Sequence, residues 1–320
     1  MPTRAGIIQK ATAEGRKAWT NYLEAQQRYL YGIYRSMADD LSMALIRAEK
    51  EGHITPYKAR QVRQKIAAMT GLPKMKLGAV VGRLPPGLYK QLQHSISKGM
   101  AQSVDYGLKN SILAMYAGDV PASKLKIGTS FIGKDGQVRR FDAAQQTFAS
   151  STWNKVSRHT VNAVKQWKPG GVAFSERVWE ITYQTQKQLL GALEQGVVQG
   201  HSAGRISRAI RQHLALPDTF RGEVLKDFHP GVGIYKSAYK NAMRLARTEL
   251  SRAYTEGTVR YAMAKSWLDG WIWRLGNVDA CEICAANAGK FFAKPNPPGI
   301  PAHPHCLCHA ELHIQGDPKA

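Results

Sequence analysis

Residues 19–45 read WTNYLEAQQRYLYGIYRSMADDLSMAL, a run in which apolar side chains recur three, four or seven positions apart. The apolar and aromatic positions at helical spacing are Trp19, Leu23, Tyr29, Leu30, Ile33, Tyr34, Met37, Leu41 and Leu45. A period of 3.6 residues puts these side chains on one face of a helix. The run therefore predicts a helix over about residues 8–51 and, with it, a mainly α protein.

Further helices follow along the chain. Thr55 and Pro56 form a typical helix start, with Thr as the N-cap and Pro in the first turn. Helical periodicity predicts helices over about 55–69, 87–117, 153–167, 175–200, 202–217 and 235–266. After them Trp271 and Trp273 alternate as in a strand, so we expect a small α+β region at the C-terminal end.

The segment between the helices changes character. Residues 127–132 and 138–141 flank Gly133-Lys134-Asp135-Gly136, which predicts a short hairpin or, alternatively, an ordered loop. We expect three parts of the chain: a basic helical N-terminal region (1–120), a hairpin with a linker and a connecting helix (121–175), and a C-terminal domain (176–320).

The charge of the chain is large and uneven. Its 320 residues carry 45 Lys and Arg against 23 Asp and Glu, a formal net charge of +22, while 43% hydrophobic residues exclude a disordered basic tail. Residues 1–170 hold 27 basic and 10 acidic residues, a net of +17, whereas 171–320 hold 18 and 13, a net of +5. A charge so far from zero indicates a polyanionic partner, either nucleic acid or an acidic protein surface.

The longest window without an acidic residue runs from Gly52 to Val104. Its nine basic residues are our candidate contacts to DNA or another polyanion: Lys58, Arg60, Arg63, Lys65, Lys74, Lys76, Arg83, Lys90 and Lys98. Phosphate binding without sequence specificity needs only such side chains at loose spacing, and no motif for reading bases is present. The alternative is a solvated helical face.

Neither a membrane span nor a secretion signal is evident. No stretch approaches the roughly 20 continuous apolar residues that cross a bilayer, and the first residues lack the apolar core of a signal peptide. We expect no membrane contact.

All four cysteines lie between residues 281 and 308, whereas a disulfide framework usually spreads its cysteines through a small chain. This clustering favours a metal site in a reducing compartment.

Cys281 and Cys284 form a Cys-x2-Cys pair, whose turn lets two thiolates bind one ion. The run His303-Pro304-His305-Cys306-Leu307-Cys308-His309 supplies further ligands. In it, His303 and Cys306 have the same two-residue gap, and so do His305 and Cys308. Two such pairs of ligands predict one structural Zn²⁺ ion per chain. Cys281, Cys284 and Cys306 are the firm ligands, and the fourth is His303 or Cys308. The alternatives are four reduced cysteines without metal and an opportunistic disulfide.

The order of motifs over residues 176–315 resembles the phage Mu F-like minor head (head morphogenesis) family. The motifs are Gly196-x3-Gly200-His201-Ser202, Ala246-Arg247-Thr248-Glu249, the strand tryptophans, Asp279-x-Cys281-x2-Cys284, Asn287-Ala288-Gly289-Lys290-Phe291 and His303-Pro304-His305-Cys306-Leu307-Cys308. One position departs from the family, which usually has Arg where this chain has Leu307. The resemblance leaves residues 1–175 unmatched.

The resemblance implies a virion protein of a tailed bacteriophage, present in few copies and needed for head morphogenesis, with no established enzymatic activity. Its implied partners are the portal protein, the major capsid or scaffold proteins, and packaged double-stranded DNA bound without sequence specificity. The implied location is the interior of the phage head near the portal vertex, and the host cytoplasm during assembly. An acidic portal or scaffold surface would attract the same basic residues as DNA.

Arg247 and Glu249 match the Arg-Thr-Glu run of the family, and we expect them to brace their helix against the zinc-binding tail. The alternative is a helix-surface network, since Glu249, Arg252 and Glu256 are spaced three and four residues apart. Either role is structural.

A zinc-stabilised nuclease of the His-Asn-His type is the alternative function, with His303, His305 and His309 near a phosphodiester. Such an enzyme needs a general-base histidine and a second, hydrolytic metal with its own ligands. These histidines lie within the predicted zinc loop, and the sequence shows no second set of ligands. We therefore expect a structural protein and not an enzyme.

Overall fold

The computed structural model describes residues 4–71, 87–116, 130–132, 138–140, 155, 157–168, 171–214, 237–263, 266, 268–276 and 280–314. The helices are α1 (Arg4–Ala48), α2 (Pro56–Thr70), α3 (Leu88–Tyr116), α5 (Phe174–Val198), α6 (Ala203–Leu214), α7 (Ala238–Met263) and α8 (Glu282–Asn287), and residues 157–166 are also helical. The strands are β1 (Glu49–Lys50), β2 (His53–Ile54), β3 (Ser130–Ile132), β4 (Val138–Arg140), β5 (Leu268–Arg274), β6 (Phe291–Ala293) and β7 (His309–Ile314). The protein is mainly helical, as the sequence predicted.

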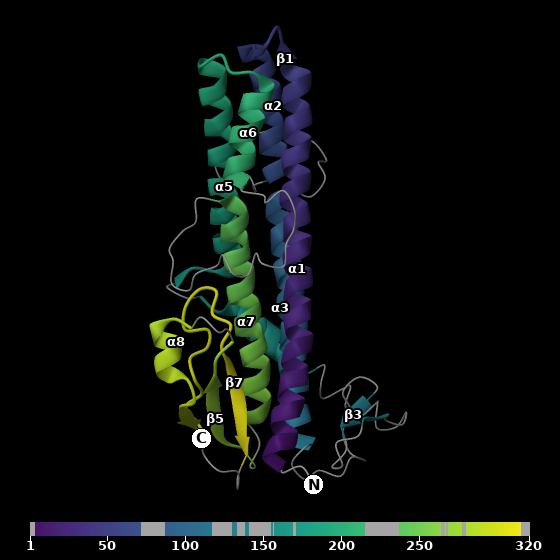
Figure 1. Ribbon diagram of the computed structural model, residues 1–320, viewed down its shortest axis with the longest axis vertical. Coiled ribbons are helices and arrows are strands. Elements are labelled where there is room, and N and C mark those ends of the chain that lie inside the picture. The colour runs from purple at the N-terminus through teal and green to yellow at the C-terminus, as the bar shows by residue number, and fades with distance from the viewer. Residues whose placement is uncertain are drawn as a thin grey trace.

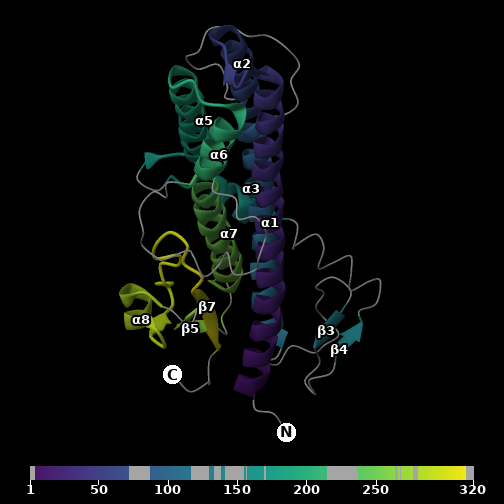
Figure 2. The same cartoon turned by 45° about the horizontal axis from the view of Figure 1, so that its top comes forward.

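The long helices form a bundle of four columns (Figures 1 and 2). The chain runs up α1, down α2 and α3, up helix 157–166 and α5, and down α6 and α7. At 1.5 Å per residue the 45 residues of α1 span about 68 Å, and Figure 1 shows α1 running along the full height of the bundle. Seven of the nine apolar positions that predicted the helix form the buried face of α1, whereas Tyr29 is exposed and Ile33 is only partly buried.

Two of the columns consist of two helices joined end to end. Gly71 ends α2 in the left-handed conformation (φ 56°), and a Cβ on it would lie 2.7 Å from the Cα of Gly87, just before α3. The hydroxyl of Ser237, just before α7, donates to the carbonyl of Leu214 at the end of α6, at 3.2 Å. The residues that flank segments 72–86 and 215–236 therefore adjoin, and each pair of helices continues one column.

The turn between α1 and α2 differs from the prediction. We expected the first helix to reach residue 51, but α1 ends at Ala48 and a two-stranded hairpin follows, pairing β1 with β2. Its turn residues Glu51 and Gly52 both have positive φ, at 53° and 80°, which is the geometry of a type I′ hairpin turn. The predicted start of α2 is confirmed, because the Thr55 side chain accepts a hydrogen bond from the backbone N–H of Lys58.

The closest helix crossing joins α3 to α7. A Cβ on Gly107 of α3 would clash with the carbonyl oxygen of Tyr254, and a Cβ on Gly257 of α7 would clash with that of Val104. Two glycines thus let the backbones approach each other, and Thr258 Oγ1 donates to the Gly107 carbonyl at 3.3 Å. One continuous hydrophobic core extends through α1, α2, α3, α5, α6 and α7, so it crosses the boundaries expected near residues 120 and 175.

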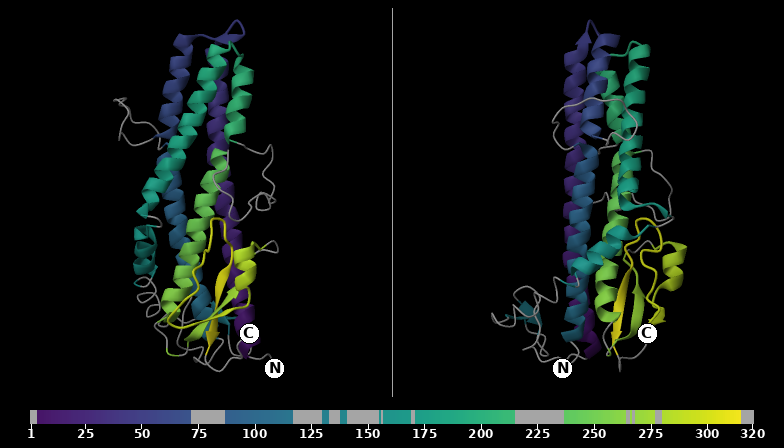
Figure 3. Two further views of the ribbon diagram at one scale, coloured as in Figure 1. Left: turned by 90° about the vertical axis from the view of Figure 1, so that its left-hand side faces the viewer. Right: turned by 180° about the vertical axis from the view of Figure 1, so that it is seen from behind.

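A second, smaller core lies at the C-terminal end of the chain. Strand β5 is the centre of an antiparallel sheet in the order β6–β5–β7, and Figure 3 shows this sheet beside the lower part of α7. Trp271 and Trp273, predicted to lie in a strand, are buried in β5. They pack with Val259 and Ala262 of α7 and with the buried cysteines, so α7 contributes to both cores.

The predicted hairpin around residue 135 and the two helices that follow it are present in the described parts of the chain. Strands β3 and β4 pair antiparallel, with Ser130 opposite Arg140, which confirms the hairpin interpretation over the ordered loop. Helices 157–166 and α5 also match their predicted positions to within a few residues. In the described parts of the chain, we find no helix with the length and apolar character that a bilayer crossing requires.

Gly107→Ala tests the close crossing of α3 and α7. The added methyl group must push the two backbones apart, and overpacking of this kind costs about 1–3 kcal/mol of unfolding free energy. Gly191→Ala is the matched control, because a Cβ there meets nothing within 4 Å and the change should raise stability by up to about 1 kcal/mol through helix propensity. Urea denaturation measures both; equal effects of the two substitutions would show that the crossing is not tight.

Candidate metal centre

The four cysteines lie together between α8, the end of β5 and the loop before β7. Cys281 is the N-cap of α8 and Cys284 lies in its first turn, so their sulfurs converge on one side. His303 Nε2 lies 3.1 Å from Cys281 Sγ and 3.2 Å from Cys284 Sγ, and Cys284 Sγ lies 3.8 Å from Cys306 Sγ. Two triplets of donor atoms, Cys281–Cys284–His303 and Cys284–Cys306–Cys308, each fit within 4.8 Å. This cluster could hold a metal ion.

The donor set has the chemistry and spacing of a tetrahedral thiolate site. With metal–sulfur bonds of about 2.3 Å, the edge between two sulfurs of a tetrahedron is about 3.8 Å, which equals the distance between Cys284 and Cys306. All four cysteines are free thiols, and Cys284, Cys306 and Cys308 are buried. Sulfur and imidazole ligands buried in this way suit a soft or borderline cation.

The thiols perturb one another strongly. Burial, together with the neighbouring thiols, raises the pKa of Cys284 to about 12. The hydrogen bond between the last two cysteines lowers the pKa of Cys308 to about 5 and raises that of Cys306. Buried sulfurs this close resist joint ionisation, whereas a bound cation requires thiolates. Metal binding here would therefore release protons.

Five of the sequence-predicted residues come together in this cluster. Cys281, Cys284, His303, Cys306 and Cys308 all belong to one of the two triplets, which share Cys284. The two candidates for the fourth ligand therefore both lie in the cluster, and they occupy different triplets.

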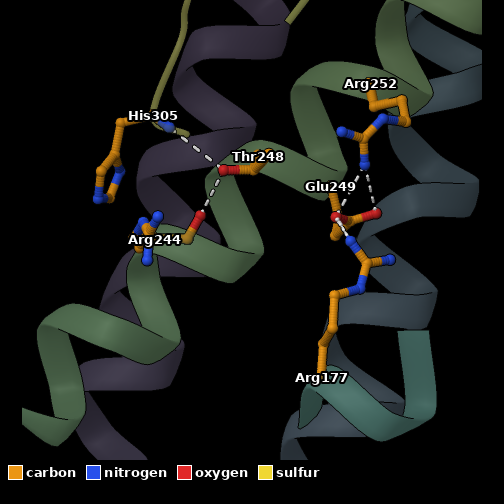
Figure 4. Close-up of polar contacts among 6 residues, drawn as sticks. All are labelled: Arg177, Arg244, Thr248, Glu249, Arg252 and His305. Atoms are coloured by element: carbon orange, nitrogen blue, oxygen red, sulfur yellow. Dashed lines mark hydrogen bonds and ion pairs between the residues drawn. The ribbon is translucent and has the colours of Figure 1, made fainter. Parts of the chain in front are cut away.

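Thr248 connects the cysteine loop to the helical bundle (Figure 4). Its hydroxyl accepts a hydrogen bond from the backbone N–H of His305 at 3.2 Å and donates to the carbonyl of Arg244 at 2.7 Å. His305 itself has a positive φ of 65°, a conformation that few non-glycine residues adopt. The backbone of His305 thus fixes the cysteine loop to α7.

Glu249, the next residue of α7, makes a different connection. Its carboxylate is fully buried and accepts hydrogen bonds from Arg177 of α5 at 2.7 Å and from Arg252 at 2.9 and 3.0 Å. The Arg252 guanidinium also lies 3.5 Å from the centre of the Trp167 ring. Glu249 therefore links α7 to α5 inside the bundle, and the expected brace of this residue against the cysteine tail is wrong. Of the alternative surface network, the Glu249–Arg252 pair is present but buried, and Glu256 pairs with Arg260. Arg247, the other predicted brace, is buried near His305.

Arg16 of α1 makes a second connection, which no pattern in the sequence predicted. Its guanidinium donates to the carbonyl of Leu307, between the last two cysteines, although the two residues are 291 positions apart. The same group lies over the rings of Trp19 and Tyr254, 5.0 and 5.9 Å from their centres. Leu307 in turn packs against the core of the bundle. The N-terminal helix thus contacts the candidate metal loop directly.

The histidines do not assemble a second metal site in the described residues. His303 joins the cysteines, and both ligand groups found there include Cys284. Burial, with the nearby charges of Arg247 and Arg244, lowers the pKa of His305 to about 3. An imidazole with such a low pKa is a weak base at neutral pH. His309 is also buried.

Six of the nine basic candidates lie along one column of the bundle. Lys58, Arg60, Arg63 and Lys65 lie on α2, Lys90 and Lys98 lie on α3, and Lys74, Lys76 and Arg83 lie outside the described residues. Arg63 is paired with Glu194 of α5 at 2.9 Å, so its charge is already balanced. Asp279 of the resemblance also lies outside the described residues.

Comparison of the chain with protein-family models, curated proteins and solved structures finds no match in any of the three.

Glu249→Gln tests the buried link between α7 and α5. Removing one partner of a buried charge group costs about 3–5 kcal/mol, because Arg177 and Arg252 lose their counter-charge. Glu256→Gln is the matched control on the same helix, since its pair with Arg260 is half exposed and should contribute less than about 1 kcal/mol. Thermal unfolding of the two variants compares them, and a Glu249→Gln protein as stable as the control would contradict the link.

Proposed function

We propose that the cysteine cluster binds one structural Zn²⁺ ion per chain. The support is the donor set, four cysteines and a histidine in two triplets that share Cys284, with one S–S distance of 3.8 Å that fits a tetrahedral edge, together with its position in a small core that few apolar residues fill. Cys281, Cys284 and Cys306 would hold the ion with either His303 or Cys308. When bound, the ion supplies folding free energy to the loop and neutralises the thiolates.

Three or four thiolates exceed the charge of a divalent ion, so the loaded site would carry a net negative charge. Arg16 lies beside Cys306 and Cys308 and would balance part of that charge. Its hydrogen bond to Leu307 keeps the guanidinium in place. Arg16 would thus both hold the cysteine loop in place and compensate the negative charge of the loaded site.

We further propose that the protein is a low-copy minor capsid (head morphogenesis) protein of a tailed bacteriophage, associated with the portal. The proposal comes from the motif order, and one structural observation carries it. Thr248 of the Ala246–Glu249 run contacts His305 of the His303–Cys308 run, so two motifs that define the resemblance form one unit although they lie about 55 residues apart in the sequence.

The architecture is consistent with a structural role. Arg247 and Glu249 are fully buried, and the Glu249 carboxylate forms ion pairs with Arg177 and Arg252 within the bundle. His303 and His305 of the nuclease alternative line the pocket at the cysteine cluster, and among the described residues no carboxylate lines it. The portal protein, capsid or scaffold proteins and packaged DNA remain the proposed partners, and the virion interior remains the proposed location.

Metal analysis of purified protein tests the zinc proposal. We expect close to one zinc per chain by inductively coupled plasma mass spectrometry. Cys284→Ser should retain none, because Cys284 belongs to both triplets, whereas His53→Ala, an exposed histidine of the β1–β2 hairpin, should retain the full amount. Of His303→Ala and Cys308→Ser, the variant that keeps its zinc identifies the residue that is not a ligand. A folded protein without metal would rule the site out.

Co-expression with the portal protein of the same phage tests the structural role. We expect the two proteins to co-purify, and we expect the protein in purified heads at a lower copy number than the capsid protein. Absence from the heads would contradict the proposal. Cleavage of plasmid DNA with Mg²⁺ or Mn²⁺, abolished by His305→Ala, would transfer the assignment to the nuclease.

A further inference from the structure

An open groove of about 450 Å³ lies where α3, helix 157–166 and the start of α5 meet. Lys90, His94 and Ser97 line it from α3, spaced at four and three residues so that they share one face. Lys165 lines it from the opposite helix, and Phe174, which is buried, belongs to its wall. Residues about 75 positions apart in the sequence thus form one concave surface.

The groove is cationic and its charges are not balanced. Lys90 and Lys165 are exposed, no acidic residue lines the groove, and within the described ranges neither lysine forms an ion pair with a carboxylate. Elsewhere in the bundle basic residues do form such pairs, as Arg63 does with Glu194 at 2.9 Å and Arg211 does with Asp39 at 2.6 Å. Two uncompensated cations at one concave site repel each other unless an anion lies between them.

Neutral hydrogen-bonding groups accompany these charges. Gln93 and Ser97 of α3 and Ser175 of α5 also line the groove, and amide and hydroxyl groups of this kind commonly contact phosphate oxygens. Lys98 continues the row on the exposed side of α3, one turn after His94. The backbone N–H of Ala173, the N-cap of α5, is already used, because it donates to the Glu176 carboxylate at 2.6 Å. The side chains that line the groove supply its charged and polar groups.

We propose that this groove binds the phosphodiester backbone of double-stranded DNA, with Lys90 and Lys165 as its two principal cations. The groove is open and not enclosed, whereas small-molecule pockets bury most of their ligand. The chain has a net charge of +22, and a backbone contact of this kind would be independent of base sequence. The inference rests on the proposed function in one respect, namely that packaged DNA is the polyanion this protein meets.

The sharpest test compares two double variants that remove the same charge from different places. Lys90→Gln/Lys165→Gln removes the groove cations, and Lys17→Gln/Lys187→Gln removes two exposed lysines of α1 and α5 outside the groove and outside the nine basic candidates, as the matched control. Binding of a 30-base-pair duplex is measured over a range of salt concentrations. The observed binding constant falls with salt, and each lost phosphate contact reduces the steepness of log K against log salt by about 1. We therefore expect the slope of the groove variant to be shallower by about 2, and the slope of the control to change far less.

Equal losses in both variants would show delocalised attraction and overturn the groove as a site, and so would an unchanged slope in the groove variant. A second measurement on the unmodified chain guards against misfolding of a variant. DNA should protect the Lys90 and Lys165 amines from acetylation more than those of Lys17 and Lys187, as read by mass spectrometry; equal protection would also overturn the proposal. Co-purification of the groove variant with the portal protein separates the two proposals, because it should persist even where DNA binding fails.

Discussion

Two consecutive residues of α7 connect the cysteine loop with the interior of the bundle. Thr248 accepts the backbone N–H of His305, while Glu249 lies buried between Arg177 and Arg252 (Figure 4). A buried carboxylate tolerates its desolvation only with such partners, so this contact fixes how α7 lies against α5. The two-glycine crossing fixes α7 against α3. The candidate metal loop therefore takes its position from a helix that is held on two sides.

The contact from Arg16 adds the first helix to this arrangement. α1 spans the bundle, its guanidinium group at position 16 reaches Leu307, and Trp19 stands 4.8 Å from Tyr254 of α7 by ring centres. The strongly basic first half of the sequence and the cysteine-containing second half thus form one folded body with a shared core. A structural metal at the loop would influence both halves, which is why the expected sequence boundaries need not be folding boundaries.

Local sequence features predicted local structure well. The Thr55–Pro56 helix start, the strand tryptophans and the spacing of the cysteine pairs all depend on neighbours within a few positions, and each appears in the structure. The β1–β2 hairpin was missed because its turn uses Glu51 at positive φ, where glycine or asparagine is the usual signal. Arg16 at Leu307 and Lys165 opposite Lys90 could not be foreseen, since helix packing alone brings such distant residues together.

Hydrogen exchange on the protein with its metal, and again after chelation, tests most directly whether the metal loop and the bundle are one unit. We expect chelation to reduce protection in β5 and β7 and, through Thr248 and Arg16, in the adjoining parts of α7 and α1. Protection in α2, α6 and the second half of α5, at the far end of the bundle, should persist. Loss confined to residues 281–308, with α1 and α7 unchanged, would contradict the coupling.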